Sequence, residues 1–273
     1  MPIHLLFCVA VISGVVGAIT GLGGGVVLVP ILTWAGIDIK HAIALNVLSV
    51  ISVSCGAAPI YIRHHITNLR VSAFLEIFAV LGALLGASIA VAVSPRPLFF
   101  VCAALLLVSA WMLWRTRRRP AVLPRPGKIS RWLELRGSYY DEAERRTLCY
   151  EGRRASLGGM LMVGTGAVAG FLGISGGAFA VLLLELMGLP PKVSSATSNL
   201  LIGVMALMGA GVFLEAGLID PTTAVPVVLG ALVGSLVGAK VAGRLTNARI
   251  RLFFLVVLIV LGVQMLQRGL RGF

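Results

Sequence analysis

The chain has 273 residues, of which 58% are hydrophobic and 12% are charged, and its formal net charge at pH 7 is +13. Ordinary soluble domains carry about 25% charged residues, so this composition excludes one. The basic excess does not indicate a nucleic-acid partner, because 12 of the 23 Lys and Arg are confined to residues 115–154. Basic residues gathered beside apolar segments more often fix topology in a lipid bilayer. We therefore expect a multi-pass protein of the cell membrane.

The first apolar segment covers residues 5–20, and a glycine-rich break separates it from a shorter apolar segment at 26–35. The opening residues lack the basic region of a signal peptide, and a similar stretch returns at 157–172, so they belong to the fold. Further apolar runs approach the roughly 20 residues that cross a bilayer core. These predicted spans are residues 42–61, 71–93, 98–113, 193–214, 222–241 and 252–265.

The sequence contains an internal repeat with an offset of about 152 residues. The break at 21–25, GLGGG, falls on GISGG at 173–177, and the agreement continues downstream, where Asn46 falls on Ser198. With a small gap, a second glycine pattern also matches, namely Gly82-x3-Gly86 with Gly230-x3-Gly234. The repeat divides the chain into membrane repeat one (3–115), a basic linker (116–155) and membrane repeat two (156–270).

Each repeat opens with about 16 apolar residues, a glycine break and ten to twelve more, and neither arm is comfortably long enough to span. The two arms form either a re-entrant hairpin or one long broken helix that crosses. Charge placement favours the hairpin, because the basic linker then shares a side with most of the remaining Lys and Arg. We therefore expect an all-α polytopic membrane protein with two inverted structural repeats. Each is a re-entrant glycine-broken helical hairpin plus three transmembrane helices, with a cytoplasmic linker and both termini outside.

The linker contains two β-prone stretches, residues 132–140 and 147–154, around a charged segment. This pattern predicts a small cytoplasmic β-hairpin. The proline-rich residues 120–126 before it are expected to be extended.

The two glycine breaks are the expected ligand site, because irregular backbone at membrane depth is tolerated only where protein buries it or it lines a cavity. A helix begins after each break, and its N-terminus presents free N–H groups and a partial positive charge that suit an anion. Neutral side chains early in the next helix are expected to complete the coordination. The candidate substrate-binding residues are Gly23, Gly24, Gly25, Asn46, Ser175, Gly176, Gly177, Ser198 and Asn199. The alternative is that the glycines allow close helix packing and that Ser and Asn join helices.

The sequence offers little for catalysis, so we expect neither an enzyme nor a metal or other cofactor. It contains no GxSxG, HExxH or Walker A motif. Cys8, Cys55, Cys102 and Cys149 lack metal-binding spacing, and packing is the expected role of each. Among the few ionisable residues of the apolar segments, Glu76 is a minor candidate for proton coupling.

The duplicated glycine motif, the small polar segments after it, the Gly-x3-Gly helices and the polar linker together resemble the TauE/SafE family of sulfite and organosulfonate exporters. The resemblance covers essentially the whole chain. Pro30 follows the family pattern, whereas its counterpart Leu182 and the serine at position 175 depart from it. The resemblance implies transport, as a probable exporter, of sulfite, a sulfonate or a related sulfur oxyanion, which suits a site without cationic side chains.

Two other functions are alternatives to this interpretation. One is a permease for another small anion, such as a carboxylate or thiosulfate. The other is a membrane thiol relay that uses Cys55, although no base such as His accompanies Cys55 in its predicted span. The Gly- and Ala-rich helix faces permit a homodimer without requiring one.

Overall fold

The structure is a computed structural model that describes residues 2–21, 23–93, 100–101, 103–104, 106–108, 110–111, 114, 135–141, 146–172, 177–244 and 247–271. Its elements in chain order are α1 (Ile3–Thr20), α2 (Gly25–Trp34), α3 (Ile39–Arg63), α4 (Leu69–Ala92), β1 (Arg136–Asp141), β2 (Arg146–Glu151), α7 (Ala155–Leu172), α8 (Gly177–Leu186), α9 (Pro191–Glu215), α10 (Pro221–Arg244) and α11 (Asn247–Arg271). The predicted span at 98–113 is described only in part, and its described residues are helical.

Five of the described helices, α1, α3, α4, α9 and α10, are long and apolar enough to cross a membrane. The longest of them, α3 and α9, have 25 residues each, which corresponds to about 37 Å at 1.5 Å per residue. These helices support the expected multi-pass membrane protein. α1 differs from its prediction, because it extends over 18 residues and has the length and composition of a span by itself.

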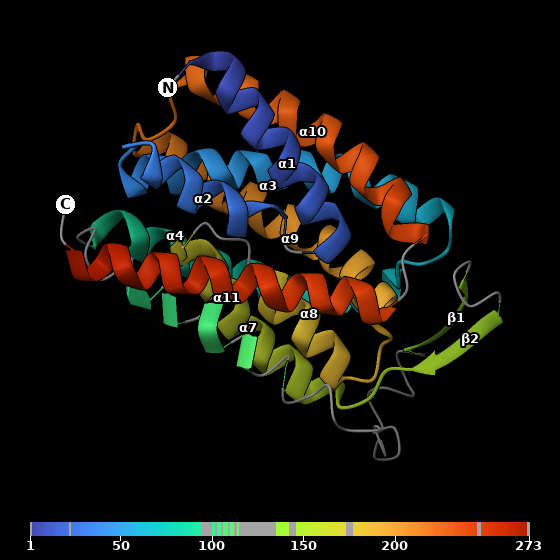
Figure 1. Cartoon of the computed structure of the whole chain (residues 1–273). Coiled ribbons are helices and arrows are strands. Elements are labelled where there is room, and N and C mark those ends of the chain that lie inside the picture. The colour runs from blue at the N-terminus through green and yellow to red at the C-terminus, as the bar shows by residue number, and fades with distance from the viewer. Residues whose placement is uncertain are drawn as a thin grey trace.

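The first glycine break reverses the direction of the chain. Ser13 Oγ on α1 donates a hydrogen bond of 2.7 Å to the carbonyl oxygen of Gly24, just before α2. The backbone of Gly24 also lies against Gly17, so a Cβ added to Gly17 would overlap the backbone of Gly24. In one continuous helix, residues 13 and 24 would be about 16 Å apart. α2 therefore folds back along α1, as the two blue helices in Figure 1 show.

The second glycine break joins α7 and α8 in a similar hairpin. A Cβ on Gly158, near the start of α7, would lie 2.7 Å from the sulfur of Met187, one residue beyond α8. The N–H of Arg153 donates a hydrogen bond of 2.7 Å to the carbonyl oxygen of the same Met187. α8 thus returns to the end of the bundle at which α7 begins. Residues 173–176, between the two helices, lie outside the described part of the chain.

Two parallel helix pairs, α1 with α10 and α4 with α7, pack through glycines. In each pair the glycine backbone lies directly against carbonyl groups of the facing helix, at distances that leave no room for a Cβ. This close approach matches the small-xxx-small packing of membrane helices. The pairs of glycine and facing carbonyl include Gly230 with Phe7, Gly234 with Val11, Gly238 with Val15, Gly82 with Val163 and Gly86 with Ala167.

The two ends of the bundle differ. Figure 1 shows both chain termini at one end, called here the terminal end, and β1 with β2 at the opposite end, called the linker end. β1 and β2 pair antiparallel, from Arg136 opposite Glu151 to Asp141 opposite Arg146. They overlap the two stretches predicted to be β-prone, and each extends one residue beyond its stretch toward the turn. The strands therefore form one small hairpin beside the helices.

Asn68, between α3 and α4, fastens the helices to this hairpin. Its side-chain Nδ2 donates to the hydroxyl of Tyr150 on β2 at 3.2 Å, and its backbone N–H donates to Thr197 Oγ1 on α9 at 3.1 Å. Burial raises the pKa of Tyr150, an effect that the hydrogen bond from Asn68 partly offsets. The α3–α4 turn, the start of α9 and β2 are thereby held together at the linker end.

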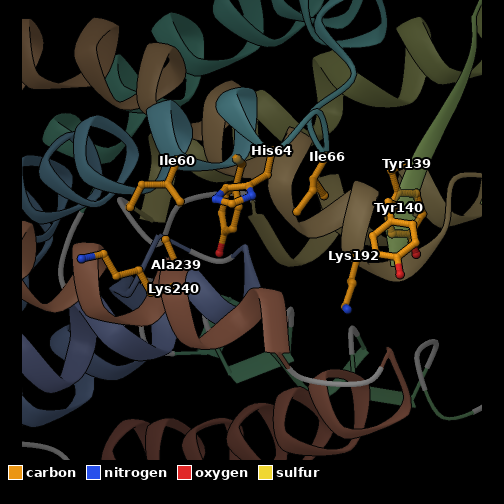
Figure 2. A pocket seen from close by; sticks show the side chains of 9 residues that line it. Ile60, His64, Ile66, Tyr139, Tyr140, Lys192, Ala239 and Lys240 are labelled. Atoms are coloured by element: carbon orange, nitrogen blue, oxygen red, sulfur yellow. The ribbon is translucent and has the colours of Figure 1, made fainter. Parts of the chain in front are cut away.

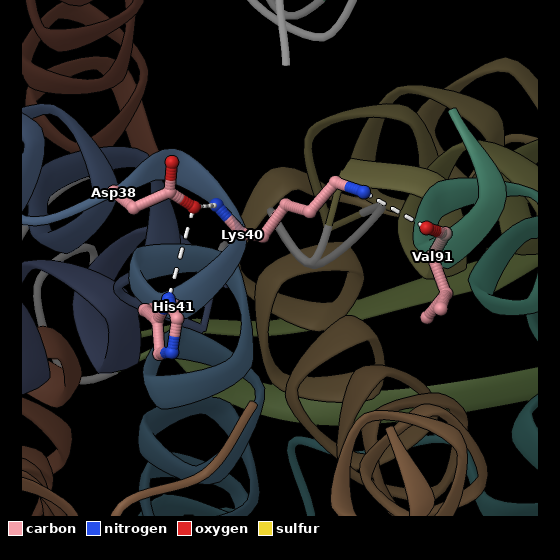
Figure 3. A network of polar contacts seen from close by, with 4 residues as sticks. All are labelled: Asp38, Lys40, His41 and Val91. Carbon is pink, nitrogen blue, oxygen red and sulfur yellow. Dashed lines mark hydrogen bonds and ion pairs between the residues drawn. The ribbon is translucent and has the colours of Figure 1, made fainter. Parts of the chain in front are cut away.

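A separate polar network holds the terminal end (Figure 3). Asp38 caps α3 by accepting a hydrogen bond of 2.8 Å from the N–H of Lys40, and His41 Nδ1 lies 3.7 Å from the same carboxylate. The Lys40 ammonium donates to the carbonyl oxygen of Val91 at 2.8 Å. Because Val91 lies in the last turn of α4, this bond satisfies a helix-end carbonyl and joins the start of α3 to the end of α4.

Candidate functional site

The first break has a backbone that favours glycine. Gly21, Gly23 and Gly24 all have positive φ, at 78°, 69° and 79°. A residue with a side chain is strained in this conformation. In addition, a Cβ on Gly21 would collide with Ser195, and a Cβ on Gly24 would collide with Ser13. The glycines are therefore needed both for the turn and for the close approach of neighbouring helices.

The start of α2 presents backbone donors inside the protein. Gly24 is the N-cap of α2 and has no side chain with which to accept a hydrogen bond. Gly23, Gly24 and Gly25 are buried, and among the described residues none accepts a hydrogen bond from their N–H groups. Buried N–H groups in proteins are nearly always paired, so this cluster of donors invites a ligand or water.

The carbonyl groups at the end of α1 are satisfied by side chains from two other helices. Ala18 O accepts from the hydroxyl of Tyr61 on α3 at 2.8 Å and from Asn199 Nδ2 on α9 at 3.0 Å. Ile19 O accepts from Ser195 Oγ, also on α9, at 3.0 Å. A helix that ends within a bilayer cannot leave these acceptors unpaired, so the three side chains permit the break to exist at that depth.

Ser198 on α9 connects the two breaks. Its hydroxyl donates to Gly21 O at 2.9 Å and lies 3.5 Å from Gly177 O at the start of α8. Ser198 is fully buried. The ends of the two glycine-rich segments therefore lie within reach of one side chain, although 156 residues separate them in sequence.

Asn46 occupies the corresponding place on α3. It is fully buried, and a Cβ added to Gly25 would collide with its side-chain amide. Ser49, one turn further along α3, is also fully buried, and its hydroxyl has no hydrogen-bond partner among the described residues. Both side chains are neutral, as are those that bond α1, so the site rests on backbone and amide or hydroxyl dipoles.

The predicted site residues differ in where they lie and in what they contact. It brings Gly23, Gly24, Gly25, Asn46, Gly177 and Ser198 to the two breaks, whereas Ser175 and Gly176 lie outside the described residues. The donors of Asn199 are both engaged, on Ala18 O and on Ser195 O at 3.1 Å. Asn199 therefore holds the end of α1, which agrees with the alternative that small polar residues join helices.

Three further residues at the first break were missed in the sequence, namely Ser13, Tyr61 and Ser195. Ser195 had a usable pattern, because it lies three residues before Ser198 and thus on the same helix face. No such pattern marks Ser13 or Tyr61. The hydrogen bond from Ser13 to Gly24 depends on the chain reversal, and that from Tyr61 to Ala18 depends on tertiary packing.

The structure corrects the interpretation of the cysteines. Cys8, Cys55 and Cys149 are free and exposed, so they do not pack in the core as predicted, and Cys102 lies outside the described residues. Cys55 in particular is exposed, whereas Ser52 and Ser54 on the same helix, α3, are buried. Across the described residues, no three His, Cys, Asp or Glu gather where they would hold a metal ion.

Comparisons with known proteins agree with this architecture. The family model for the sulfite exporter TauE/SafE matches residues 6–265. The chain belongs to this family. It is 25% identical to the probable membrane transporter protein YunE of Bacillus subtilis over 280 residues, which cover 99% of each chain. A probable membrane transporter protein of Haemophilus influenzae is 26% identical over 248 residues, or 86% of this chain and 83% of that protein. No solved structure matches the chain.

As a TauE/SafE member, the protein is a multi-pass membrane transporter with a small substrate and a lipid environment. The family, the relatives and the long apolar helices support the same conclusion independently of the site geometry. The identity of the substrate is a separate question, which the chemistry of the breaks addresses.

Proposed function

We propose that the protein transports a small sulfur oxyanion, such as sulfite or an organosulfonate, bound between the two glycine breaks and moved outward as an exporter. The observation that carries the proposal is the buried group of N–H donors at Gly23, Gly24 and Gly25, for which no described residue is an acceptor. The N-terminal end of α2 adds a partial positive charge at the same place. An oxyanion satisfies several such donors at once, and no buried cation is needed.

The other predicted residues have distinct roles in this proposal. Gly177 begins α8 and offers a second helix N-terminus, and Ser175 and Gly176 belong to the same break. Asn46 and Ser49 supply neutral donors from α3. Ser198 holds the two breaks together, and Asn199 maintains the end of α1.

We propose that the chain is built as two inverted repeats around this site, with units 3–115 and 156–270 joined by a cytoplasmic linker at 116–155. The helix contacts support the arrangement, because equivalent contacts recur 152 positions apart. Gly82 faces Val163 O, whereas Gly234 faces Val11 O. This spacing relates Gly82 to Gly234 without a gap, so the alignment of Gly82 with Gly230 is off by one helical turn. Alternating access then arises as the repeats rock about the breaks.

Anion-dependent stabilisation of the purified protein in detergent tests the substrate class. Sulfite, thiosulfate, sulfoacetate, taurine, sulfate and acetate are compared at equal ionic strength by thermal unfolding. A ligand that binds only the folded protein stabilises it, by about 2.7 kcal/mol at 100 times its Kd. We expect a selective shift with a sulfur oxyanion that is mostly lost in Gly25→Ala, where the methyl group displaces Asn46. A larger shift with acetate, or one that Gly25→Ala leaves unchanged, would overturn the proposal.

The thiol-relay alternative is tested in the same series with Cys55→Ala. Because Cys55 is exposed, removing its thiol leaves the breaks intact. We expect both the sulfite shift and transport to persist in this variant. Loss of transport with retained folding would favour the relay.

A further inference from the structure

A carboxyl group lies within α4 and has no part in the proposed anion site. Glu76 is seven residues beyond Leu69, where α4 begins, which corresponds to about 10 Å at 1.5 Å per residue. Its Oε1 is buried and has no hydrogen-bond partner among the described residues. A lone charge at this depth in a membrane helix is costly, so an ionisable residue there calls for a partner or a function.

The helix geometry places Glu76 on the side of α4 that packs against α7. The carbonyl groups of Ala79 and Ala83 lie against Gly166 and Gly170 of α7. Glu76 is three residues before Ala79 and seven before Ala83, so the three residues share one face of α4. The carboxyl therefore belongs to the glycine-packed contact between the two helices.

Two hydroxyl groups lie between Glu76 and the linker end. Ser72 is one turn before Glu76 on α4, and Thr67 comes just before the helix. Their oxygens are also buried, and neither has a hydrogen-bond partner in the described part of the chain. The Ser72 hydroxyl is close enough to interact with the Glu76 carboxyl. Because a hydroxyl both donates and accepts, this row of oxygens suits the passage of a proton between the linker end and Glu76.

The helices that pack against α4 provide no counter-charge for Glu76. α7 contains no charged or titratable residue. α9 contains Lys192 in its first turn and Glu215 as its last residue, which is exposed. Lys192 lines a cavity of about 140 Å³ at the linker end, where Figure 2 shows it beside Tyr139 and Tyr140.

The other charged groups around this helix pair do not neutralise Glu76 either. Arg70 and Arg154 are exposed, and the Arg153 guanidinium lies 3.8 Å from the carboxylate of Glu151. Glu185 on α8 is itself acidic. Because Glu76 forms no ion pair within the described residues, its neutral form suits the packing seen here.

We propose that Glu76 is a proton-binding site, which holds its proton while α4 and α7 are packed as in this structure and releases it in the alternate conformation. An unpaired carboxylate favours a conformation in which water reaches it, so loss of the proton shifts the balance between the two. α7 leads directly into the second break, and a movement of α7 therefore reaches the anion site.

The coupling of this proton to transport rests on the proposed function, whereas proton binding itself does not. In an exporter, an inward proton gradient drives an anion outward only when the proton moves in the opposite direction. Glu76 thus exchanges a proton for the anion.

Carbodiimide labelling tests proton binding without transport. Dicyclohexylcarbodiimide is apolar and modifies protonated carboxyl groups, and mass spectrometry of the full chain in detergent locates the adduct. We expect Glu76 to be labelled at about pH 6 and at least about tenfold less at about pH 10, because each pH unit above the midpoint removes about nine-tenths of the acid form. The exposed Glu215 is the control and should stay unlabelled. Labelling of Glu76 that is absent, or that does not change with pH, overturns the proton site.

Proteoliposomes test the coupling. Methanesulfonate is the probe, because it keeps its charge at every pH used, and potassium with valinomycin clamps the membrane potential. Wild-type vesicles that are acidic inside should accumulate it. Glu76→Gln, which has the shape of the neutral acid, should lose this accumulation and keep the exchange of labelled for unlabelled methanesulfonate at equal pH. Glu215→Gln should retain both.

Two results would overturn the coupling. One is accumulation by Glu76→Gln at the wild-type level, and the other is wild-type accumulation only when the vesicles are acidic outside. A failure of the proposed function has a different signature. In that case Glu76 is labelled as predicted while no sulfonate crosses the membrane, and the proton site stands.

Discussion

At the scale of single residues, the glycine break depends on side chains that lie far away in sequence. The end of α1 inside the bundle leaves carbonyl groups that Tyr61, Ser195 and Asn199 satisfy. The break at the glycines could be predicted, because a triple glycine between apolar segments has few roles other than breaking a helix. The carbonyl partners could not, because a serine within an apolar helix has the same local pattern whether it caps a neighbour or bonds its own helix, as Ser88 does.

Ser198→Ala tests the bridge between the breaks. The change removes the hydrogen bond to Gly21 O, so we expect a loss of about 0.5–1.5 kcal/mol in unfolding free energy. Weaker anion-dependent stabilisation should accompany it, because the two breaks lose a shared contact. Ser88→Ala is the matched control, since the exposed Ser88 hydroxyl bonds only Leu84 O of its own helix. Equal effects of the two changes would show that the bridge contributes nothing.

At the scale of elements, glycines set the distance between α4 and α7 and between α1 and α10. The apolar runs predicted most of the long helices, and the Gly-x3-Gly patterns predicted close packing. Which helices pair could not be read from the sequence, because each pair combines one helix from either half of the chain. The register of the repeat was also misjudged by one turn at Gly82, since glycines four residues apart give two equally good alignments.

Two neighbouring glycines of α7 test this packing. Gly166 lies against Ala79 O of α4, whereas Gly164 has nothing within 4 Å of an added Cβ. We expect Gly166→Ala to destabilise the protein by about 1–3 kcal/mol, because the helices must separate. Gly164→Ala should be neutral or stabilise by up to about 1 kcal/mol, since alanine favours the helix. Thermal unfolding of both variants in detergent gives the comparison, and a loss at both positions would contradict the packing described.

At the scale of the whole molecule, we propose that the two ends of the bundle lie on opposite sides of the membrane. The linker end carries β1 and β2, and the terminal end carries both termini (Figure 1). The charge distribution in the sequence predicts that the linker end faces the cytoplasm, because basic residues are enriched on that side of a membrane. The cavity at the linker end could not be predicted, since its wall combines residues from α3, β1, α9 and α10.

Cysteine accessibility tests the orientation. The exposed Cys149 on β2 is retained as the single cysteine in one variant, and Ala216→Cys, in the exposed turn after α9, is the single cysteine of another. A membrane-impermeant maleimide should label position 216 in intact cells and Cys149 only in inverted vesicles. Labelling of both positions from the same side would exclude the inverted arrangement.

The central claim is that an oxyanion passes through the paired glycine breaks. Its most direct test is the flux of sulfite into proteoliposomes that contain the wild-type protein, Gly25→Ala or Gly164→Ala, with protein orientation and amount matched. Both variants add one methyl group at a helical glycine, but only the first places it against Asn46. We predict that Gly25→Ala lowers the sulfite flux at least about tenfold, while Gly164→Ala retains the wild-type rate. A wild-type flux in Gly25→Ala, or no sulfite flux through the folded wild-type protein, would contradict the claim.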